Sequence, residues 1–290
     1  TLIFIDRDDN TAFIDEGFEF IDETGYGGFD VYGVINLTVN DTSNIQADKF
    51  FINFSALNTL ISQDSTWNVS NITLIATTIN LSNTTLNAST INITSTDFIL
   101  ASDSALVVDN NGFRGGIAGA EGNGPGNSSR TGCDSGKSAG AGHGGEGGLS
   151  TDKTSCVGGT TYGSSLQPTT WGSGAAGNVW DSNHGRGDGG GSVRLDISNN
   201  IILDGYITAD GGNGGGNGGG RVLGGGAGGS IWITTYNLSG NGNISATGGD
   251  SLNGSDDGGG GGGGRIAVYY NISSLTYPEN STVDGGEGWE

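Results

Sequence analysis

Hydrophobic and polar residues alternate most regularly between residues 189 and 270. Short alternating runs open at Ser192, Ser230 and Arg265, and glycine-rich stretches separate them. Alternation with a period of two is the pattern of a β-strand that buries one face. The openings are 38 and 35 residues apart, a spacing typical of repeat architectures. We therefore expect the three runs to be strands of successive repeats.

A single repeat of this size cannot bury its apolar face alone, whereas stacked repeats bury it between them. The pattern thus predicts an all-β fold, a parallel β-helix or β-solenoid. Glycine supports this prediction because it permits sharp corners and close approach of neighbouring backbones, and the chain holds 60 glycines in 290 residues. Collagen is excluded, because glycine does not recur at every third position and there are only three prolines.

Changes in composition divide the chain into four regions. Residues 1–30 are expected to form an N-terminal strand, a cap or an inter-subunit strand. Residues 31–110 are rich in Asn and Thr and predict the β-solenoid body, with like residues of neighbouring rungs stacked in ladders. Residues 111–190 are a long Gly-rich insertion that we expect to pack as extended segments on the solenoid flank. Disorder is the alternative for the glycine tracts of the chain, above all for the longest one. Residues 191–290 carry the Gly-rich repeats.

The charge balance limits the classes of partner. Ten basic residues against 31 acidic ones give a formal net charge of −21, which disfavours binding to nucleic acid or to anionic membranes. No apolar run reaches the roughly 18 residues that span a bilayer, so no membrane insertion is expected. The first residues lack the basic and apolar regions of a signal peptide, which suggests a processed product or a fragment.

Two cysteines lie in the Gly-rich insertion, Cys133 and Cys156. A disulfide between them would restrain a loop with little core of its own, by a few kcal/mol at most. We predict this disulfide, and with it an oxidising, extracellular compartment. Two free thiols are the alternative, and a metal pair is disfavoured because no ligand-spaced His or Cys is nearby.

Sequons of the form N-x-[ST] are dense, and nine of them fall between residues 36 and 92. Abundant Asn, Ser and Thr would produce some by chance. The density nevertheless predicts N-linked glycans on several outward-facing side chains, and a location outside the cell or on its surface. Some are expected to face inward, where they could not be modified. The candidate asparagines are Asn36, Asn40, Asn53, Asn68, Asn71, Asn80, Asn83, Asn87, Asn92, Asn127, Asn237, Asn243, Asn253, Asn271 and Asn280.

The first apolar run is a candidate for contact with another copy of the chain. An open solenoid end exposes unpaired backbone groups, which a cap or a second copy must cover. We therefore predict that this strand is exchanged between subunits of a homopolymer, as in β-augmentation. The predicted inter-subunit strand comprises Leu2, Ile3, Phe4 and Ile5.

A calcium site is a weaker candidate in the same region. Asp6, Asp8 and Asn10 have the first three side-chain spacings of a calcium-binding loop. Thr11 stands where such a loop needs glycine, and Gly17 where it needs a bidentate glutamate. A solvated acidic turn is the preferred interpretation, and no other cofactor is expected.

Few residues suit catalysis. A triad of His143, Ser138 and Asp134 would need a rigid setting, which flexible glycine neighbours oppose. We expect His143 and His184 to bond backbone carbonyls instead; the metal-site alternative would add Glu146, Asp181 or Asp188 to them. An enzyme acting on polysaccharides would align Arg194, Arg221 and Arg265 at successive rung starts, with Asp196 and Asp210 nearby.

Several segments resemble the Gly-rich β-helix surface and adhesin-like proteins found in large secreted polypeptides. The similarity covers roughly residues 100–270. It rests on Gly-Ala-Gly-His-Gly-Gly-Glu-Gly-Gly at 140–148, Tyr-Gly-Ser at 162–164 with Pro168, Gly-Gly-Gly-Ser at 189–192, Asp-Gly-Tyr-Ile-Thr-Ala-Asp-Gly-Gly at 204–212, and Gly-Gly-Arg-Ile-Ala-Val-Tyr-Tyr at 263–270. The resemblance implies a parallel β-helix at a cell surface, with adhesion or a structural coat as its role.

Three functions remain open. The first is a non-enzymatic structural glycoprotein that polymerises through β-strand contacts as a surface filament, sheath or coat. The second is an adhesin that recognises glycans or a cell surface, with Trp171, Trp180 and Trp289 as contact residues. The third is a carbohydrate-active β-helix enzyme. We expect the first.

Overall fold

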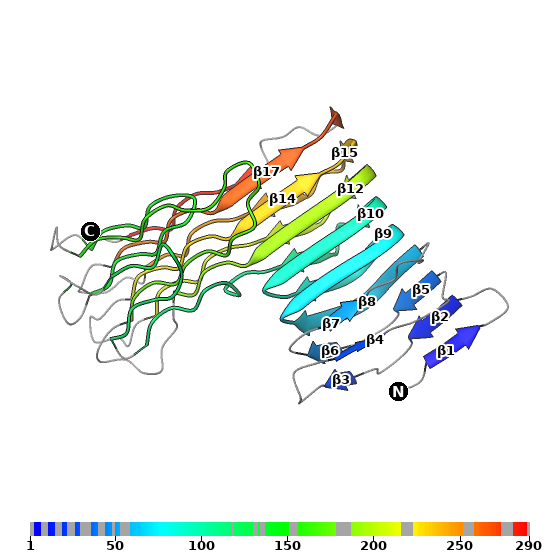
Figure 1. The fold of residues 1–290 in the computed structure, drawn as a ribbon, viewed down its shortest axis with the longest axis horizontal. Helices are drawn as coiled ribbons and strands as arrows, with labels where there is room; N and C mark the ends of the chain where they lie inside the picture. The colour runs from blue at the N-terminus through cyan, green and yellow to red at the C-terminus, as the bar shows by residue number, and fades with distance from the viewer. Residues whose placement is uncertain are drawn as a thin grey trace.

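The computed structural model shows an all-β chain whose strands form one large, mostly parallel sheet of 19 strands. Within the described residues there is no helix, and so none that is long and apolar enough to cross a bilayer. The structure describes only the strand backbones before residue 59, and then residues 59–117, 119–129, 133, 137–150, 156–177, 187–215, 223–251, 258–273 and 281–288. Figure 1 shows the strands side by side, from the N-terminal end in blue to the C-terminal end in orange.

The seven strands before residue 59 are short. They are β1 (Ile3–Asp6), β2 (Thr11–Ile14), β3 (Glu19–Ile21), β4 (Gly27–Phe29), β5 (Asn36–Val39), β6 (Asn44–Ala47) and β7 (Phe50–Ile52). β1 pairs with β2 in antiparallel orientation, whereas every other strand pair in the structure is parallel. β1 belongs to the region expected to form a cap or an inter-subunit strand. It pairs with a strand of its own chain along one of its two edges.

The strands from residue 59 onward supply the described core. They are β8 (Thr59–Val69), β9 (Asn71–Asn87), β10 (Thr90–Leu100), β11 (Ala105–Val107), β12 (Ser192–Leu203), β13 (Tyr206–Thr208), β14 (Ser230–Thr234), β15 (Asn237–Ser239), β16 (Asn243–Ser245), β17 (Arg265–Tyr269), β18 (Ile272–Ser273) and β19 (Ser281–Thr282). Four of them, β8, β9, β10 and β12, have 11–17 residues.

The strands pair in register with strands one sequence period away. Asn71 of β9 pairs with Thr90 of β10, 19 residues later. Ser192 of β12 pairs with Ser230 of β14, and Ser230 pairs with Arg265 of β17. The three repeat openings expected from the sequence therefore lie in one column across the sheet, and the periods of 38 and 35 residues are confirmed. The period of 19 residues in the Asn/Thr-rich region was not predicted.

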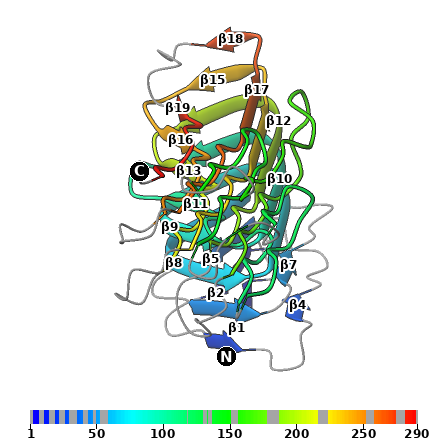
Figure 2. The same ribbon diagram turned by 90° about the vertical axis from the view of Figure 1, so that its left-hand side faces the viewer.

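The sheet curls so that its alternating apolar residues meet in one core (Figure 2). Each column of inward-facing residues continues through successive strands, because the register is kept. One column holds Ile72, Ile91, Val193, Ile231 and Ile266, and a second holds Leu86, Leu106, Ile207 and Ile244. All of these except Ile266 are buried. Burying a side chain of this kind contributes about 1.5–3 kcal/mol.

Polar side chains at the corners form hydrogen bonds with the next rung. The acceptor side chains Asp204, Asp210, Asn213 and Asp250 each take a hydrogen bond from the backbone N–H 37 residues later, at 2.7–3.0 Å. Constant spacing means that each corner ties two successive rungs together. A polar ladder also crosses β10, β12 and β15, in which Asn237 donates to Asn200 at 2.9 Å and Asn200 donates to Asp97 at 2.7 Å.

The backbones of the glycine-rich stretches form hydrogen bonds with one another. Successive N–H groups of one segment donate to three different neighbours: Gly140 to Gly148, Ala141 to Gly225, and Gly142 to Gly126. Donors three residues apart return to the same neighbour: Gly225 donates to Gly259, and Gly228 donates to Gly262. A bonding period of three matches the three residues per turn of a polyproline II helix. In Figure 1 these segments lie together beyond the ends of β12, β14 and β17.

Close packing explains why glycine is needed there. A Cβ added at Gly140 would lie 1.9 Å from the carbonyl oxygen of Gly260, and one at Gly144 would lie 1.9 Å from that of Gly264. Neighbouring backbones thus occupy the space that any side chain would need. The described glycine segments are packed elements of the fold and contain few apolar side chains, chiefly the buried Ala141, Ala175 and Ala227.

Candidate functional site

The predicted disulfide is present. Cys133 and Cys156 are joined, with their Cα atoms 4.4 Å apart, and the structure contains no free cysteine among its described residues. The bond closes the loop that carries the glycine segment 137–150. It therefore restrains one stretch of the packed glycine-rich segments, here called the glycine bundle, which bury few apolar side chains of their own.

The best-defined buried polar group is His143, which is fully buried in the glycine-rich layer. Its Nδ1 lies 2.7 Å from the carbonyl oxygen of Gly228, so Nδ1 carries the proton and donates it. Its Nε2 lies 2.9 Å from the hydroxyl of Thr170, which is then the donor. Burial lowers the pKa of His143 to about 4, and nearby Arg265 adds to this effect, while the bond to Gly228 opposes it. The histidine is neutral at pH 7 and bonds a backbone carbonyl, as expected.

Tyr162 and Arg265 complete this cluster. The Tyr162 ring packs 4.7 Å from the His143 ring, and its hydroxyl donates to the Trp171 carbonyl and accepts from Ser173 at 2.8 Å. Arg265 donates to the carbonyl of Tyr162 at 2.9 Å and to that of His143 at 3.4 Å. Burial raises the pKa of Tyr162 to about 12. The cluster thus fastens the glycine layer to the start of β17.

The candidate triad does not assemble around this histidine. Both ring nitrogens are taken by Gly228 and Thr170, and the hydroxyl of Ser138 donates to the carbonyl of Ala176 at 2.6 Å. Asp134 lies outside the described residues, as do His184 and Asp181. Of the remaining metal candidates, Glu146 is exposed and Asp188 accepts from the Gly115 N–H at 2.6 Å. The described residues contain no group of three His, Cys, Asp or Glu that could hold a metal.

The proposed alignment of arginines is wrong for the two that the structure describes. Arg194 shares its register column with Trp232 and Ala267, whereas Arg265 shares a column with Ser192 and Ser230. The two arginines occupy different positions along their strands, so the register places them in different columns. Arg221 lies outside the described residues. Separately, Asp210 belongs to a corner ladder, where it accepts from the Ser245 hydroxyl at 2.6 Å and from the Thr247 N–H.

The corner ladder also includes Asp109, whose carboxyl group has a raised pKa. Asp109 accepts from the Asp210 N–H at 2.7 Å and from the Thr208 hydroxyl at 2.9 Å. Burial raises the pKa of the Asp109 carboxyl, and the negative charge of Asp210 adds to the rise, while the two hydrogen bonds oppose it.

The described sequons all lie outside the core. None of their ten asparagines is buried, and Asn83, Asn243 and Asn271 are exposed. The expectation that some face inward therefore fails for these ten, because none of them is buried. Side-chain amides of Asn83, Asn127 and Asn237 donate hydrogen bonds within the chain, which competes with modification. Whether any of them carries a glycan stays a prediction.

The N-terminal candidates are described only in part. Ile3 to Ile5 lie in β1, where they pair with Ile14 to Ala12 of β2, and Leu2 is outside the described residues. Of the calcium candidates, Asp6 ends β1, while Asp8 and Asn10 are outside the described residues. Strand exchange and calcium binding stay predictions.

A groove on the outer face of the last three repeats was not expected from the sequence. Its floor is one register column, Asp196 of β12, Thr234 of β14 and Tyr269 of β17. The corner after β14 and β17 supplies Tyr236, Tyr270 and Asn271. The groove has a cavity volume of about 720 Å³. Its three tyrosines are each 43–47% exposed, so the aromatic surface is open to solvent.

Of the three tryptophans expected to make adhesive contacts, the structure describes only Trp171, which is partly buried. Trp171 donates its Nε1–H to the Thr90 hydroxyl at 3.0 Å and packs edge-on against Phe113, so it fastens the glycine layer to the sheet. Trp180 and Trp289 lie outside the described residues. Adjacent tyrosines at 269–270 were the only sequence signal for the groove, since its other residues come together through the register.

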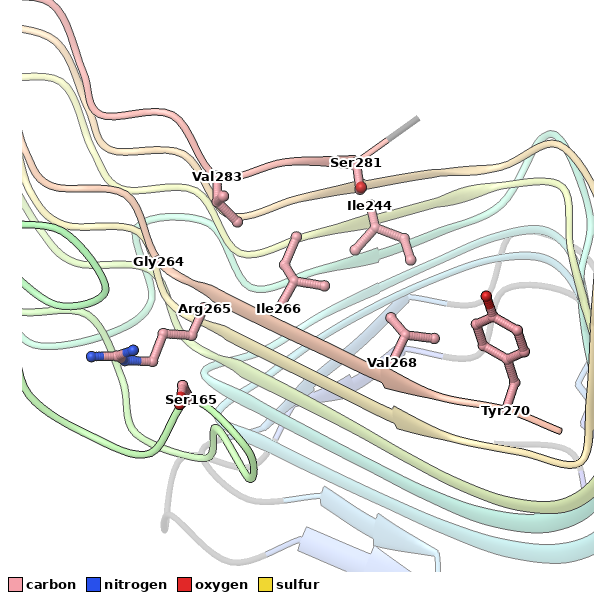
Figure 3. A pocket seen from close by; sticks show the side chains of 9 residues that line it. All are labelled: Ser165, Ile244, Gly264, Arg265, Ile266, Val268, Tyr270, Ser281 and Val283. Atoms are coloured by element: carbon pink, nitrogen blue, oxygen red, sulfur yellow. The ribbon is translucent and has the colours of Figure 1, made fainter. Parts of the chain in front are cut away.

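The C-terminal end of the stack carries a second hollow, shown in Figure 3. Ile266 and Val268 of β17 point into it, opposite Ile244, with Ser281 and Val283 above them. It has a cavity volume of about 410 Å³. Val283 is 46% exposed, which leaves part of the apolar column open to solvent at this end.

Comparison with known proteins gives no relative: no family model, no curated protein and no solved structure matches the chain. The fold and these two hollows are therefore the basis for assigning a function. The all-β, parallel sheet is compatible with the β-helix-like fold that the sequence resemblance implied.

Proposed function

We propose that the chain is a non-enzymatic extracellular structural glycoprotein, a β-solenoid that polymerises through strand contacts into a surface filament, sheath or coat. The observation that carries this proposal is strand β17 together with the apolar hollow beside it. Among the described strands, β17 pairs with β14 alone, so its other edge has no strand partner there. Beside this edge, the hollow lined by Ile266, Val268 and Val283 exposes apolar surface.

The residues of β17, β18 and β19 favour the addition of one strand over end-to-end stacking of two whole sheets. Leu238 of β15 pairs with Ser273 of β18, and Ile244 of β16 pairs with Ser281 of β19. Ile266 and Val268 of β17 keep the inward columns of that strand aliphatic. The apolar surface thus lies along β17, where β-augmentation would place an added strand.

β1 offers a matching strand. β1 pairs with β2 alone among the described strands, and its sequence Ile-Phe-Ile-Asp is strongly apolar. β1 of one copy, added to β17 of the next, makes a head-to-tail contact between two different surfaces. Such contacts do not close unless the rotation happens to form a ring, so they generate filaments. The disulfide, the corner ladders and the glycine bundle support an extracellular rod that carries load between such contacts.

Assembly of purified chain tests this proposal by electron microscopy and sedimentation. Val283→Asp places a charge in the end hollow, and Val157→Asp is the matched control, because Val157 is 51% exposed in the Gly-rich region. We expect filaments from the native chain and from Val157→Asp, and single rods from Val283→Asp. Removal of residues 1–22 should also abolish them. Filaments of unchanged length distribution from both the Val283 variant and the truncated chain would refute the proposal.

A further inference from the structure

We propose that the groove of Asp196, Thr234, Tyr236, Tyr269, Tyr270 and Asn271 binds neutral pyranose glycans. This inference does not depend on polymerisation. It rests on what the register and the corner bring together on the outer face of β12, β14 and β17.

The floor of the groove matches a short piece of a sugar chain. Asp196, Thr234 and Tyr269 come from three adjacent strands, which are spaced about 4.8 Å apart, so the column is about 10 Å long. That is the length of a disaccharide. A carboxylate, a hydroxyl and an aromatic ring follow one another along it. A pyranose offers both an apolar C–H face, which suits the ring, and hydroxyl groups, which suit the carboxylate.

One aromatic ring of the groove and the backbone of its corner are held before any ligand arrives. The Tyr269 hydroxyl donates to the Leu166 carbonyl at 2.7 Å, which fixes the ring. The backbone carbonyl of Tyr236 accepts from the N–H groups of Asn271 and Ile272, at 3.1 and 2.9 Å, which joins the two sides of the corner. Binding therefore requires little ordering of the groove, and a preorganised site loses less entropy on binding.

The charges of the groove and of the whole chain favour a neutral sugar over an anionic one. None of the described residues that line the groove is Lys or Arg, and its one ionisable carboxylate, Asp196, is paired with Arg194 at 3.3 Å just outside it. The chain as a whole carries a net charge of −21. An anionic polysaccharide would meet no cation in the groove and a repulsive field around it. Within the floor of the groove, β12 and β14 are paired on both edges and could not accept a peptide strand.

Asn271 provides a second source of the same chemistry. It is exposed, it lines the groove, and it begins the sequon Asn271-Ile272-Ser273. A glycan attached there would reach the tyrosines of its own chain. The groove could thus hold either a sugar of another molecule or the first sugars of its own glycan, and the experiment must distinguish them.

Affinity electrophoresis in native gels tests the proposal. The chain, produced without glycosylation, is run through gels containing mannan, β-glucan or galactan as neutral polymers, and alginate as an anionic one. We expect retardation by at least one neutral polymer and about tenfold weaker binding for Tyr236→Ala or Tyr270→Ala. Tyr206→Ala is the control, because Tyr206 is 50% exposed on β13 and does not line the groove. Circular dichroism confirms that the variants are folded.

The outcomes separate the two sources. If the chain made in a glycosylating host loses retardation and Asn271→Gln restores it, its own glycan occupies the groove. If retardation is the same in both hosts, the sugar comes from another molecule. Three results would overturn the proposal: no retardation of the unglycosylated chain by any neutral polymer, retardation by alginate alone, or equal loss in Tyr206→Ala and Tyr270→Ala.

Discussion

Gly140→Ala should destabilise the fold strongly, although the change adds a single methyl group. The added Cβ would lie 1.9 Å from the Gly260 carbonyl oxygen and 2.5 Å from the Gly260 carbonyl carbon. The backbone of Gly140 is not in the left-handed region, so the conflict is purely one of space. Both contacts are with backbone atoms, which cannot move aside as the end of a side chain can.

The magnitude follows from the bonds that a shift would disturb. Gly140 donates to Gly148 at 3.0 Å, and Gly148 donates to Gly260 at 2.7 Å. Each such bond contributes about 1 kcal/mol, and overpacking costs about 1–3 kcal/mol. Reduced entropy of the unfolded chain offsets about 0.4–1 kcal/mol. We expect a net loss of about 3 kcal/mol in the free energy of unfolding.

Gly285→Ala is the matched control, because its added Cβ would meet nothing closer than the Gly261 carbonyl oxygen at 3.4 Å. That is an ordinary contact, so we expect a change within about 1 kcal/mol of zero. Urea unfolding followed by tryptophan fluorescence and calorimetry would compare the two variants with the native chain. Equal stability of Gly140→Ala and Gly285→Ala would refute the packed glycine bundle.

Two further predictions concern buried polar groups. The pKa of His143 falls from its ordinary 6.5 to about 4 in the folded chain. The free energy of unfolding should therefore be constant above pH 6.5 and decline as the pH falls towards 4, by about 3 kcal/mol in total. His143→Gln should flatten this decline, and an unchanged pH dependence would contradict the lowered pKa of His143. Asp210→Ala removes the acceptor of the Ser245 and Thr247 bonds and should lower the free energy of unfolding by about 2 kcal/mol, whereas a loss below 0.5 kcal/mol in urea titration would mean that the corner ladder contributes little.

The repeat architecture was predictable because it follows from local patterns. Alternation identified the strands that open at Ser192, Ser230 and Arg265, and their spacing identified the strands that pair. The cysteine pair followed from composition and context. In the Asn/Thr-rich region the period of 19 residues was missed, since apolar residues there form a nearly continuous series of short runs without glycine breaks.

The candidate sites were less predictable because they depend on register and on corners. A difference of two positions along the strand separates Arg194 from Arg265, and no single strand reveals it. The groove tyrosines 236, 269 and 270 lie far from Asp196 in sequence and meet only through strand pairing. Bonding within the glycine bundle was hidden as well, because glycine carries no side-chain pattern that could report its neighbours.

Electron microscopy of the protein isolated from its native source tests the central claim most directly. The account predicts filaments or sheets whose axial repeat equals the length of one stacked unit, with continuous β-structure across each junction between β17 and the next copy. Single rods of uniform length, with no end-to-end contact at any concentration, would contradict it.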